Sequence, residues 1–138
     1  NGTSPFDLRQ SLQELNWNKV GVGRKETDLS QAVSEIEALA AEAGNMRVAG
    51  GPAYNMMHTT AVDLRSMIDV SRMVVASARV REETRGAHFR QDFPKQQDDY
   101  GLFNTCLRRG ANGLPEMEKK PVVFKHKSLA ECQQYRKG

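Results

Sequence analysis

The feature that most constrains this fold is a long apolar-periodic stretch from about Tyr54 to Thr84. Its middle, from Met67 to Val80, is apolar over most of the circumference of a helix. We therefore predict one long helix here, as the central and most buried element of the chain. The preceding segment contains Gly50-Gly51-Pro52 and is predicted to be a loop, and Gly86 is predicted to stop the helix.

A first helix is predicted to begin at Ser4-Pro5-Phe6-Asp7, where Ser4 can cap the helix and proline suits its first position. Its apolar side chains fall on two nearly opposite faces at 100° per residue. A helix that is apolar on two faces packs between two partners, and only one of them has to belong to this chain. One face is predicted to hold Leu8, Leu12, Leu15 and Val22, and the other Phe6, Trp17 and Val20.

A second helix is predicted to begin near Asp28 and Leu29, with Gln31 placed to complete a capping box. Gly44-Asn45 is typical of a helix end. The apolar residues of this segment form one stripe, which predicts packing along a single face. The stripe consists of Leu29, Ala32, Val33, Ile36, Ala40 and Ala43.

The character of the chain changes after Pro94. A polar linker is predicted over 95–99, followed by a β-hairpin whose strands run from Tyr100 to Leu107 and from Leu114 to Phe124, around a glycine-bearing turn. Ser128-Leu129-Ala130-Glu131 is a capping box that predicts a short last helix. The predicted fold is mainly α: residues 1–94 form a three-helix bundle ending in RGAHFRQDFP, and 95–138 form the linker, β-hairpin and short C-terminal tail.

Charge and composition exclude several classes of protein. The net charge of +3, from 20 basic and 17 acidic residues, is too mild for nucleic-acid binding, which needs a concentrated basic stripe. No apolar run reaches the roughly 18–20 residues of a membrane helix, so we expect a soluble protein without direct membrane insertion. Cys106 and Cys132 fit free thiols in a reducing compartment, and a disulfide between them stays open. Asn1-Gly2-Thr3-Ser4 enters a helix without a Met, which indicates a processed or excised piece.

A polar segment follows the long helix and carries His88, Arg90 and Asp92 at every second position. In an extended segment these three side chains point to one side, and Phe89, Gln91 and Phe93 to the other. His and Asp together can orient a proton transfer. We favour the alternative that these groups dock the extended segment by hydrogen bonds and ion pairs.

Arg65, Arg72 and Arg79 form a heptad-spaced line along the long helix. Asp69 stands near the first two, and Glu83 lies four residues after Arg79, a spacing that allows an ion pair. A line of guanidinium groups could bind carboxylates of a partner. A solvated ladder of salt bridges is the favoured interpretation.

No metal or cofactor site is predicted. The methionines are explained by core packing, and the spacing of the three histidines builds no zinc site with the cysteines. Gly21-x-Gly23 lacks the third glycine of a dinucleotide fingerprint, and no phosphate-binding loop is present. The chain by itself is therefore expected to hold no FAD.

The segment Arg85–Pro94 reads Arg-Gly-Ala-His-x-Arg-x-Asp-x-Pro. It resembles the signature of the C-terminal helical domain of the flavoprotein subunit of succinate dehydrogenase and fumarate reductase. Leu15–Arg24 is similar to the first helix and exit turn of that family, and Lys120-Pro121-Val122 resembles the strand that ends its late hairpin. The resemblance runs from about Asp7 to about Val122.

The resemblance implies an FAD enzyme that interconverts succinate and fumarate by hydride transfer and exchanges electrons through an iron–sulfur subunit. In that family the substrate-binding and FAD-linking residues lie in the flavin and capping domains, so no catalytic residue is assigned here and the fragment alone is expected to be inactive. Its implied role is a scaffold that docks on those domains and on the iron–sulfur subunit. Its implied location is cytoplasmic, peripheral to the inner membrane through the full complex. The docking residues assigned are Arg85, His88, Arg90, Asp92 and Trp17.

This chain departs from the family pattern in the first late strand. Where the family usually carries a Trp and a His-Thr pair, this chain has Gly101, Leu102, Phe103 and Asn104-Thr105. This difference leaves open which electron-transfer partner the tail contacts.

Two alternatives for the identity of the chain stay open. The equivalent domain of L-aspartate oxidase carries a similar Arg-Gly motif. A free-standing helical interaction module is the alternative from a different class.

Overall fold

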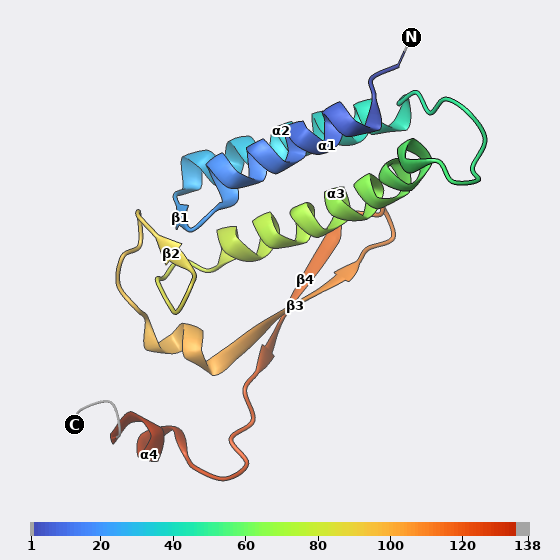
Figure 1. Ribbon diagram of the computed structural model, residues 1–138. Helices are drawn as coiled ribbons and strands as arrows, with labels where there is room; N and C mark the ends of the chain where they lie inside the picture. Colours follow the sequence, from blue (N-terminus) through green and yellow to red (C-terminus); the bar gives the residue numbers. More distant parts are fainter. Residues whose placement is uncertain (1, 135–138) are drawn as a thin grey trace.

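The computed structural model describes residues 2–134, apart from the side chains of residues 129, 132 and 133. Three helices pack into a bundle, and a β-hairpin lies on the side of the third helix that faces away from the first two (Figure 1). This arrangement confirms the predicted mainly α fold. The main elements are α1 (Pro5–Leu15), α2 (Glu26–Gly44), α3 (Met56–Val80), β3 (Phe103–Arg109) and β4 (Pro115–Pro121).

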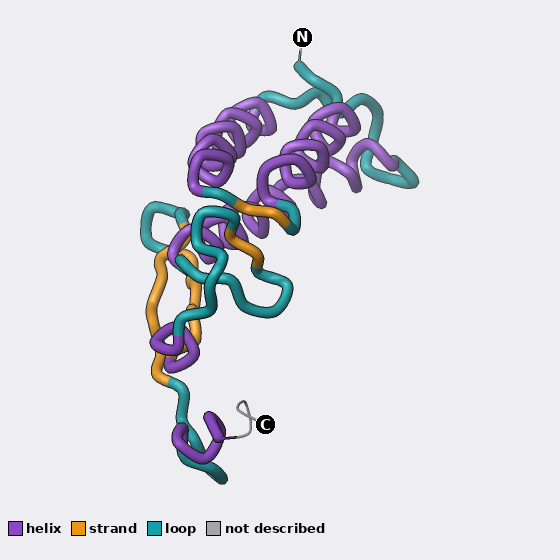
Figure 2. The backbone as a smooth tube through the Cα atoms, turned by 90° about the vertical axis from the view of Figure 1, so that its left-hand side faces the viewer, coloured by secondary structure: helices purple, strands orange, loops and turns teal. Residues whose placement is uncertain are grey.

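Shorter elements connect these parts. The π-helix η1 (Asn16–Val20) continues α1, and the 3₁₀ helix η2 (Asp98–Leu102) leads into the hairpin. The two-residue strands β1 (Gly23–Arg24) and β2 (Phe89–Arg90) pair in parallel at the end of the bundle. The hairpin continues past β4 to the short helix α4 (Leu129–Gln134), which stands apart from the bundle (Figure 2).

Helix α1 begins as predicted, because Oγ of Ser4 accepts a hydrogen bond from the N–H of Phe6 at 3.3 Å and Pro5 is the first helical residue. Its continuation changes the phase of the predicted faces. The wider turn of the π-helix brings Val20 into the core, where it is buried, and leaves Val22 exposed by 75%. The predicted positions of these two valines were therefore wrong.

Helix α2 begins at Glu26, two residues before the predicted start. Lys25 at the N-cap gives no side-chain cap; the carboxylate of Asp92 instead accepts a hydrogen bond from the N–H of Glu26 at 2.8 Å. Gln31 completes no capping box and accepts a hydrogen bond from Lys19. The helix ends at Gly44 as predicted, and most of its apolar stripe is buried.

Helix α3 runs from Met56 to Val80, and the Asn55 side chain caps its N-terminus. It stops short of the predicted Thr84. Gly86, with φ +58°, lies in a later turn from Arg85 to His88, so it does not stop the helix. The middle of α3, predicted to be apolar over most of its circumference and the most buried part of the chain, has one exposed face: Val70, Met73 and Val74 are exposed by 52%, 37% and 41%.

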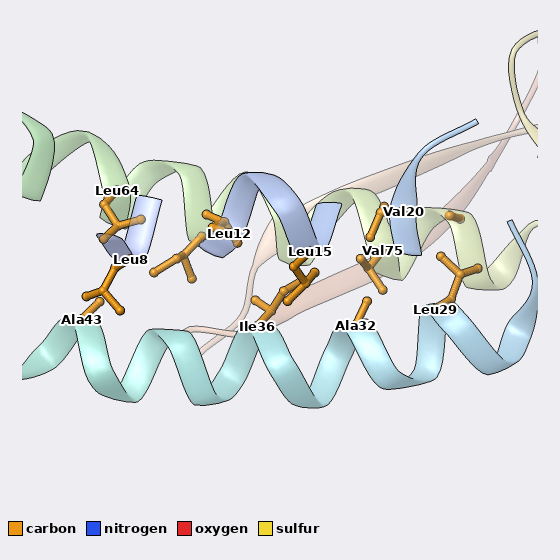
Figure 3. Packing of buried hydrophobic residues seen from close by; sticks show 12 residues of the cluster. Leu8, Leu12, Leu15, Val20, Leu29, Ala32, Ile36, Ala43, Leu64 and Val75 are labelled. Atoms are coloured by element: carbon orange, nitrogen blue, oxygen red, sulfur yellow. The ribbon is translucent and has the colours of Figure 1, made fainter. Parts of the chain in front are cut away.

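The core lies where the three helices meet (Figure 3). Leucine and isoleucine side chains from α1, α2 and α3 interdigitate there, with alanines where the helices approach closely. Within residues 2–134 no helix is long and apolar enough to cross a lipid bilayer. The buried members are Leu8, Leu12, Leu15, Val20, Leu29, Ala32, Ile36, Ala43, Leu64, Ile68, Val75 and Ala78.

The C-terminal part follows the predicted order. Strands β3 and β4 pair antiparallel, and Gly113, with φ +79°, occupies the turn between them. The capping box before α4 forms, since Ser128 donates its N–H to the Glu131 carboxylate at 2.7 Å. Among the described side chains Cys106 forms no disulfide. The side chain of Cys132 lies outside the described residues, so a pairing of the two stays untested.

Candidate functional site: a polar junction at the end of the bundle

Charged side chains gather where α3 ends, α2 begins and the strands β1 and β2 pair. We call this cluster the polar junction. It is built mainly by the segment after α3, together with two residues near the start of α2. Its members are Arg24, Glu26, Arg81, Glu83, Thr84, Arg85, His88, Arg90 and Asp92.

Arg90 is the centre of the junction and its side chain is 0% exposed. The guanidinium group donates from Nη1 to the carbonyl oxygens of Ala78 and Arg79 at 2.9 and 3.2 Å. These carbonyls belong to the last turn of α3. The carbonyl oxygens at the end of a helix accept no hydrogen bond from within the helix, and they form the negative end of its dipole. Arg90 therefore caps α3 with a fixed cation.

Asp92 extends this link to the next helix. Arg90 binds its carboxylate with two hydrogen bonds of 2.8 Å each. The same carboxylate accepts the hydrogen bond from the N–H of Glu26 at the start of α2, where the dipole is positive. The bonds from Arg90 hold the pKa of Asp92 far below its usual range, with the bond from Glu26 adding to the effect. One ion pair thus ties the end of α3 to the beginning of α2.

Glu83 organises the other half of the junction. Its side chain is 0% exposed and accepts hydrogen bonds from Nε and Nη2 of Arg85 at 2.8 and 3.1 Å and from the N–H of Gln97 at 2.9 Å. Burial alone raises the pKa of Glu83, but the hydrogen bonds from Arg85 and Gln97 lower it overall. The buried carboxylate therefore stays ionised and ties the linker after Pro94 to the junction.

His88 bridges two partners. Its Nδ1 lies 2.7 Å from Nη1 of Arg24, and its Nε2 lies 2.9 Å from the carbonyl oxygen of Arg81. A guanidinium group can only donate and a carbonyl can only accept, so the ring is neutral with its proton on Nε2. Burial lowers the pKa of His88, and the nearby charges of Arg24, Arg90 and Arg81 lower it further.

The protonation of His88 predicts a pH dependence of stability. Its pKa in the folded chain lies below the ordinary value of 6.5, so between the two values the unfolded chain binds more protons. This contribution to stability is complete above about pH 6.5 and is lost as the pH falls through the lowered pKa. Urea unfolding from about pH 7.5 to about pH 5.5 should show a larger loss of stability for the wild type than for His88→Gln. Equal losses would contradict the bridging role of the neutral ring.

The structure brings four of the five predicted docking residues together. Arg85, His88, Arg90 and Asp92 lie in the junction and bind mostly within the chain. Trp17 lies apart from them on η1, with 84% of its surface exposed. The favoured interpretation, that the polar groups dock the segment itself, agrees with these bonds.

The ion-pair partners of Glu83 and Arg79 were predicted wrongly. Glu83 was expected to pair with Arg79, but it pairs with Arg81 and Arg85, while Arg79 pairs with Glu26 at 2.7 Å. The missed signal was the spacing in Arg81-x-Glu83-x-Arg85: in the non-helical segment after Val80, two basic residues flank one acid.

The arginine line of α3 contacts α2. Arg72 binds both carboxylate oxygens of Glu37 at 2.8 and 2.7 Å, and also Asp69 at 3.0 Å. Arg65 forms no ion pair within residues 2–134. Of the predicted ladder only the Arg72–Asp69 pair forms within α3. Arg72 and Arg79 also link α3 to Glu37 and Glu26 of α2, at partly exposed positions.

The central side chains of the polar junction are engaged within the chain. Both nitrogens of His88 are engaged, and Arg90 is saturated by carbonyls and a carboxylate. In the described part of the chain no group of His, Cys, Asp or Glu is arranged to hold a metal ion. The chemistry that this arrangement performs is structural: it fixes residues 81–97 against the ends of two helices.

Comparison with known proteins places this geometry in a family. Residues 9–135 match the family described as fumarate reductase flavoprotein C-term. The chain is 32% identical over 119 residues to the fumarate reductase flavoprotein subunit of Mycobacterium tuberculosis, covering 86% of this chain and 20% of that protein. It is 32% identical over 126 residues to the chloroplastic L-aspartate oxidase of Arabidopsis thaliana, covering 91% and 19%.

A solved structure shows the same architecture. The chain matches the Mycobacterium smegmatis Sdh1 complex in the apo form with a TM-score of 0.85 and 25% sequence identity, covering 97% of this chain and 24% of that chain. The chain spans only about a fifth of the length of the curated relatives it matches.

Proposed function

The chain belongs to the fumarate reductase flavoprotein C-terminal family, as a C-terminal domain of the succinate dehydrogenase and fumarate reductase flavoprotein subunits, and we propose that it is the scaffold and docking part of a longer FAD-dependent enzyme. The longer protein would bind FAD and interconvert succinate and fumarate, exchanging electrons with an iron–sulfur subunit. The names of the relatives, a fumarate reductase flavoprotein subunit and an Sdh1 complex, support a flavoprotein that acts on fumarate within a complex. The domain itself would supply no catalytic residue and no cofactor ligand.

The observation that carries the docking role is the exposure of Trp17. This indole is 84% exposed, and Phe6 on the preceding helix is 38% exposed, whereas the opposite face of α1 is buried in the core. Tryptophan is enriched at the centres of interfaces because it buries a large rigid surface. We propose that this outer face packs on the flavin-binding and capping domains of the same polypeptide.

The polar junction would support the same contact. The side chains of Arg85 and Asp92 keep 31% and 28% of their surface exposed, so a partner can reach them. Arg90 is buried and would act by fixing the shape of the segment. In this proposal residues 1–94 form the docking bundle and 95–138 the linker, hairpin and tail. The complete complex would be cytoplasmic and peripheral to the inner membrane.

Replacement of Trp17 tests the docking role. We expect Trp17→Ala to weaken association of this domain with a separately expressed flavin-binding part by about 2 kcal/mol, or about 30-fold in affinity, because a buried indole would be lost from the interface. Its own stability should change by less than about 0.5 kcal/mol, since the side chain touches solvent here. Calorimetric titration measures the affinity.

The matched control for Trp17→Ala is Tyr54→Ala, which removes another fully exposed aromatic ring, from the loop before α3. This variant should bind like the wild type. Unchanged affinity of Trp17→Ala, or an equal loss for Tyr54→Ala, would argue against the proposed docking face.

L-aspartate oxidase is the second candidate, because its plant relative matches the chain at 32% identity over 126 residues. The substrate of the full-length protein distinguishes L-aspartate oxidase from a succinate dehydrogenase or fumarate reductase. Oxidation of L-aspartate without an iron–sulfur partner would favour the oxidase, and succinate–fumarate activity that depends on such a partner would favour the first proposal. A gene without upstream flavin-binding sequence would instead indicate a free-standing module.

A further inference from the structure

A pocket of about 460 Å³ opens between the exposed face of α3, strand β3 and the polar junction. One wall is apolar and belongs to α3, where Val70 and Val74 are exposed by 52% and 41%. The other wall is polar and is formed by Arg24, Arg81 and the neutral His88. We call this site the arginine pocket.

Arg24 carries a positive charge that no carboxylate of the described residues pairs with. Arg24 donates to the carbonyl oxygen of Val20 at 2.9 Å and to His88 at 2.7 Å, and it forms no ion pair with any carboxylate in residues 2–134. Burial lowers the pKa of Arg24, and repulsion by Arg90 lowers it further. Arg24 is thus a half-buried cation without an anion, which is a costly arrangement unless a partner supplies one.

Arg81 shares its carboxylate with a second arginine. Its Nε makes no hydrogen bond and lies 3.4 Å from the carboxylate of Glu83, which also binds Arg85, and its Nη2 donates to the carbonyl oxygen of Tyr100 at 2.6 Å. The remaining carboxylates of the junction are also engaged: Asp92 by Arg90, and Glu26 by Arg79. None of the three carboxylates Glu83, Asp92 and Glu26 forms an ion pair with Arg24.

We propose that the arginine pocket receives a carboxylate side chain and a neighbouring apolar side chain from a segment of the flavin-binding part of the same polypeptide. The carboxylate would pair with Arg24, whose guanidinium fork suits two parallel hydrogen bonds. The apolar neighbour would cover Val70 and Val74. This inference rests on the proposed function, and the chain's share of about a fifth of its relatives' length leaves ample sequence for such a segment.

An acidic polypeptide segment suits the site better than a small anion. A free anion would neutralise Arg24 but would leave the apolar wall of α3 in contact with water. An apolar surface beside an unpaired arginine is typical of a protein interface, where arginine is enriched and apolar side chains fill the centre.

Photo-crosslinking in the full-length flavoprotein tests the inference. A photoreactive phenylalanine derivative replaces Val74 in the arginine pocket, and a control protein carries it at Glu42, on the exposed side of α2. Mass spectrometry should map the cross-link from position 74 to a peptide outside this domain that holds Asp or Glu next to an apolar residue. Cross-links that stay within the domain, reach only another subunit or match the control would overturn the proposal.

Variants of Arg24 test the charge directly. In the protein with the probe at position 74, Arg24→Gln should reduce the cross-link yield about tenfold, whereas Arg24→Lys should keep most of it. Equal yields for all three proteins would overturn the pairing. If Arg24→Gln fails to fold, the position of the mapped cross-link in the parent protein still tests whether the arginine pocket contacts the flavin-binding part. A full-length protein without a flavin-binding part would defeat the proposed function itself, whereas a cross-link elsewhere in such a part would defeat only this inference.

Discussion

Arg90→Met is expected to lower the free energy of unfolding by about 3 kcal/mol, because it removes one partner of a buried ion pair. Methionine keeps the apolar stem but loses every donor of the guanidinium group. The carbonyls of Ala78 and Arg79 lose their cap, and the Asp92 carboxylate loses both of its bonds to Arg90. Since Asp92 also caps α2, the damage should extend to both helix ends.

Urea unfolding followed by circular dichroism measures this loss. Arg79→Met is the matched control. Arg79 also forms an ion pair, with Glu26, but 42% of its side chain is exposed. That variant should cost less than about 1 kcal/mol. In the double variant with Asp92→Asn, the two costs should not add, since the uncompensated carboxylate is gone. Similar costs for Arg90→Met and Arg79→Met would contradict the central place of Arg90.

Leu12→Ala is expected to cost about 3 kcal/mol, since Leu12 is 0% exposed and its loss leaves a cavity among three helices. Figure 3 shows its side chain pointing into the space between α1, α2 and α3. The close packing of the neighbouring leucines and Ile36 limits collapse into the gap. The loss should appear as a lower urea midpoint without a change in slope.

Two valines provide the control for the core. Val20→Ala should cost about 1–2 kcal/mol, because the π-helix brings Val20 into the core, whereas Val22→Ala should cost less than about 0.5 kcal/mol. The helical wheel of an uninterrupted α-helix predicts the reverse order. A larger loss for Val22→Ala would show that η1 does not have the π-helical phase.

The sequence predicts the elements that local patterns encode. Ser4-Pro5 gives the start of α1, the single apolar stripe gives α2, and the glycine-bearing turn gives the hairpin. Each of these depends on neighbours within a few residues, so the spacing of apolar and capping residues suffices to find them.

The errors arise where distant residues decide the structure. Helix α2 begins at Glu26 because Asp92, 66 residues later, caps it, and no local pattern contains that information. Glu83 was assigned to Arg79 by helical spacing, but α3 ends at Val80, so that spacing does not apply. The motif of Arg85–Pro94 identified the family correctly, while the bonds it makes could be seen only in the structure.

The polar junction gives the motif a structural part in the fold. Arg90 and Asp92 join two helix ends, and Glu83 holds the linker that leads to the hairpin. These bonds fix residues 81–97 against the helix ends, while Arg24 has no carboxylate partner among the described residues. In the proposed enzyme this would give the flavin-binding part a fixed surface on which to pack.

The central claim is that the domain supports an FAD enzyme and performs no reaction by itself. The most direct test compares the purified 138-residue chain with the full-length protein, by flavin absorbance and by fumarate reduction with a reduced dye as electron donor. We expect bound FAD and fumarate reduction in the full-length protein, and neither in the 138-residue chain alone. Bound FAD together with fumarate reduction in the 138-residue chain would contradict that claim.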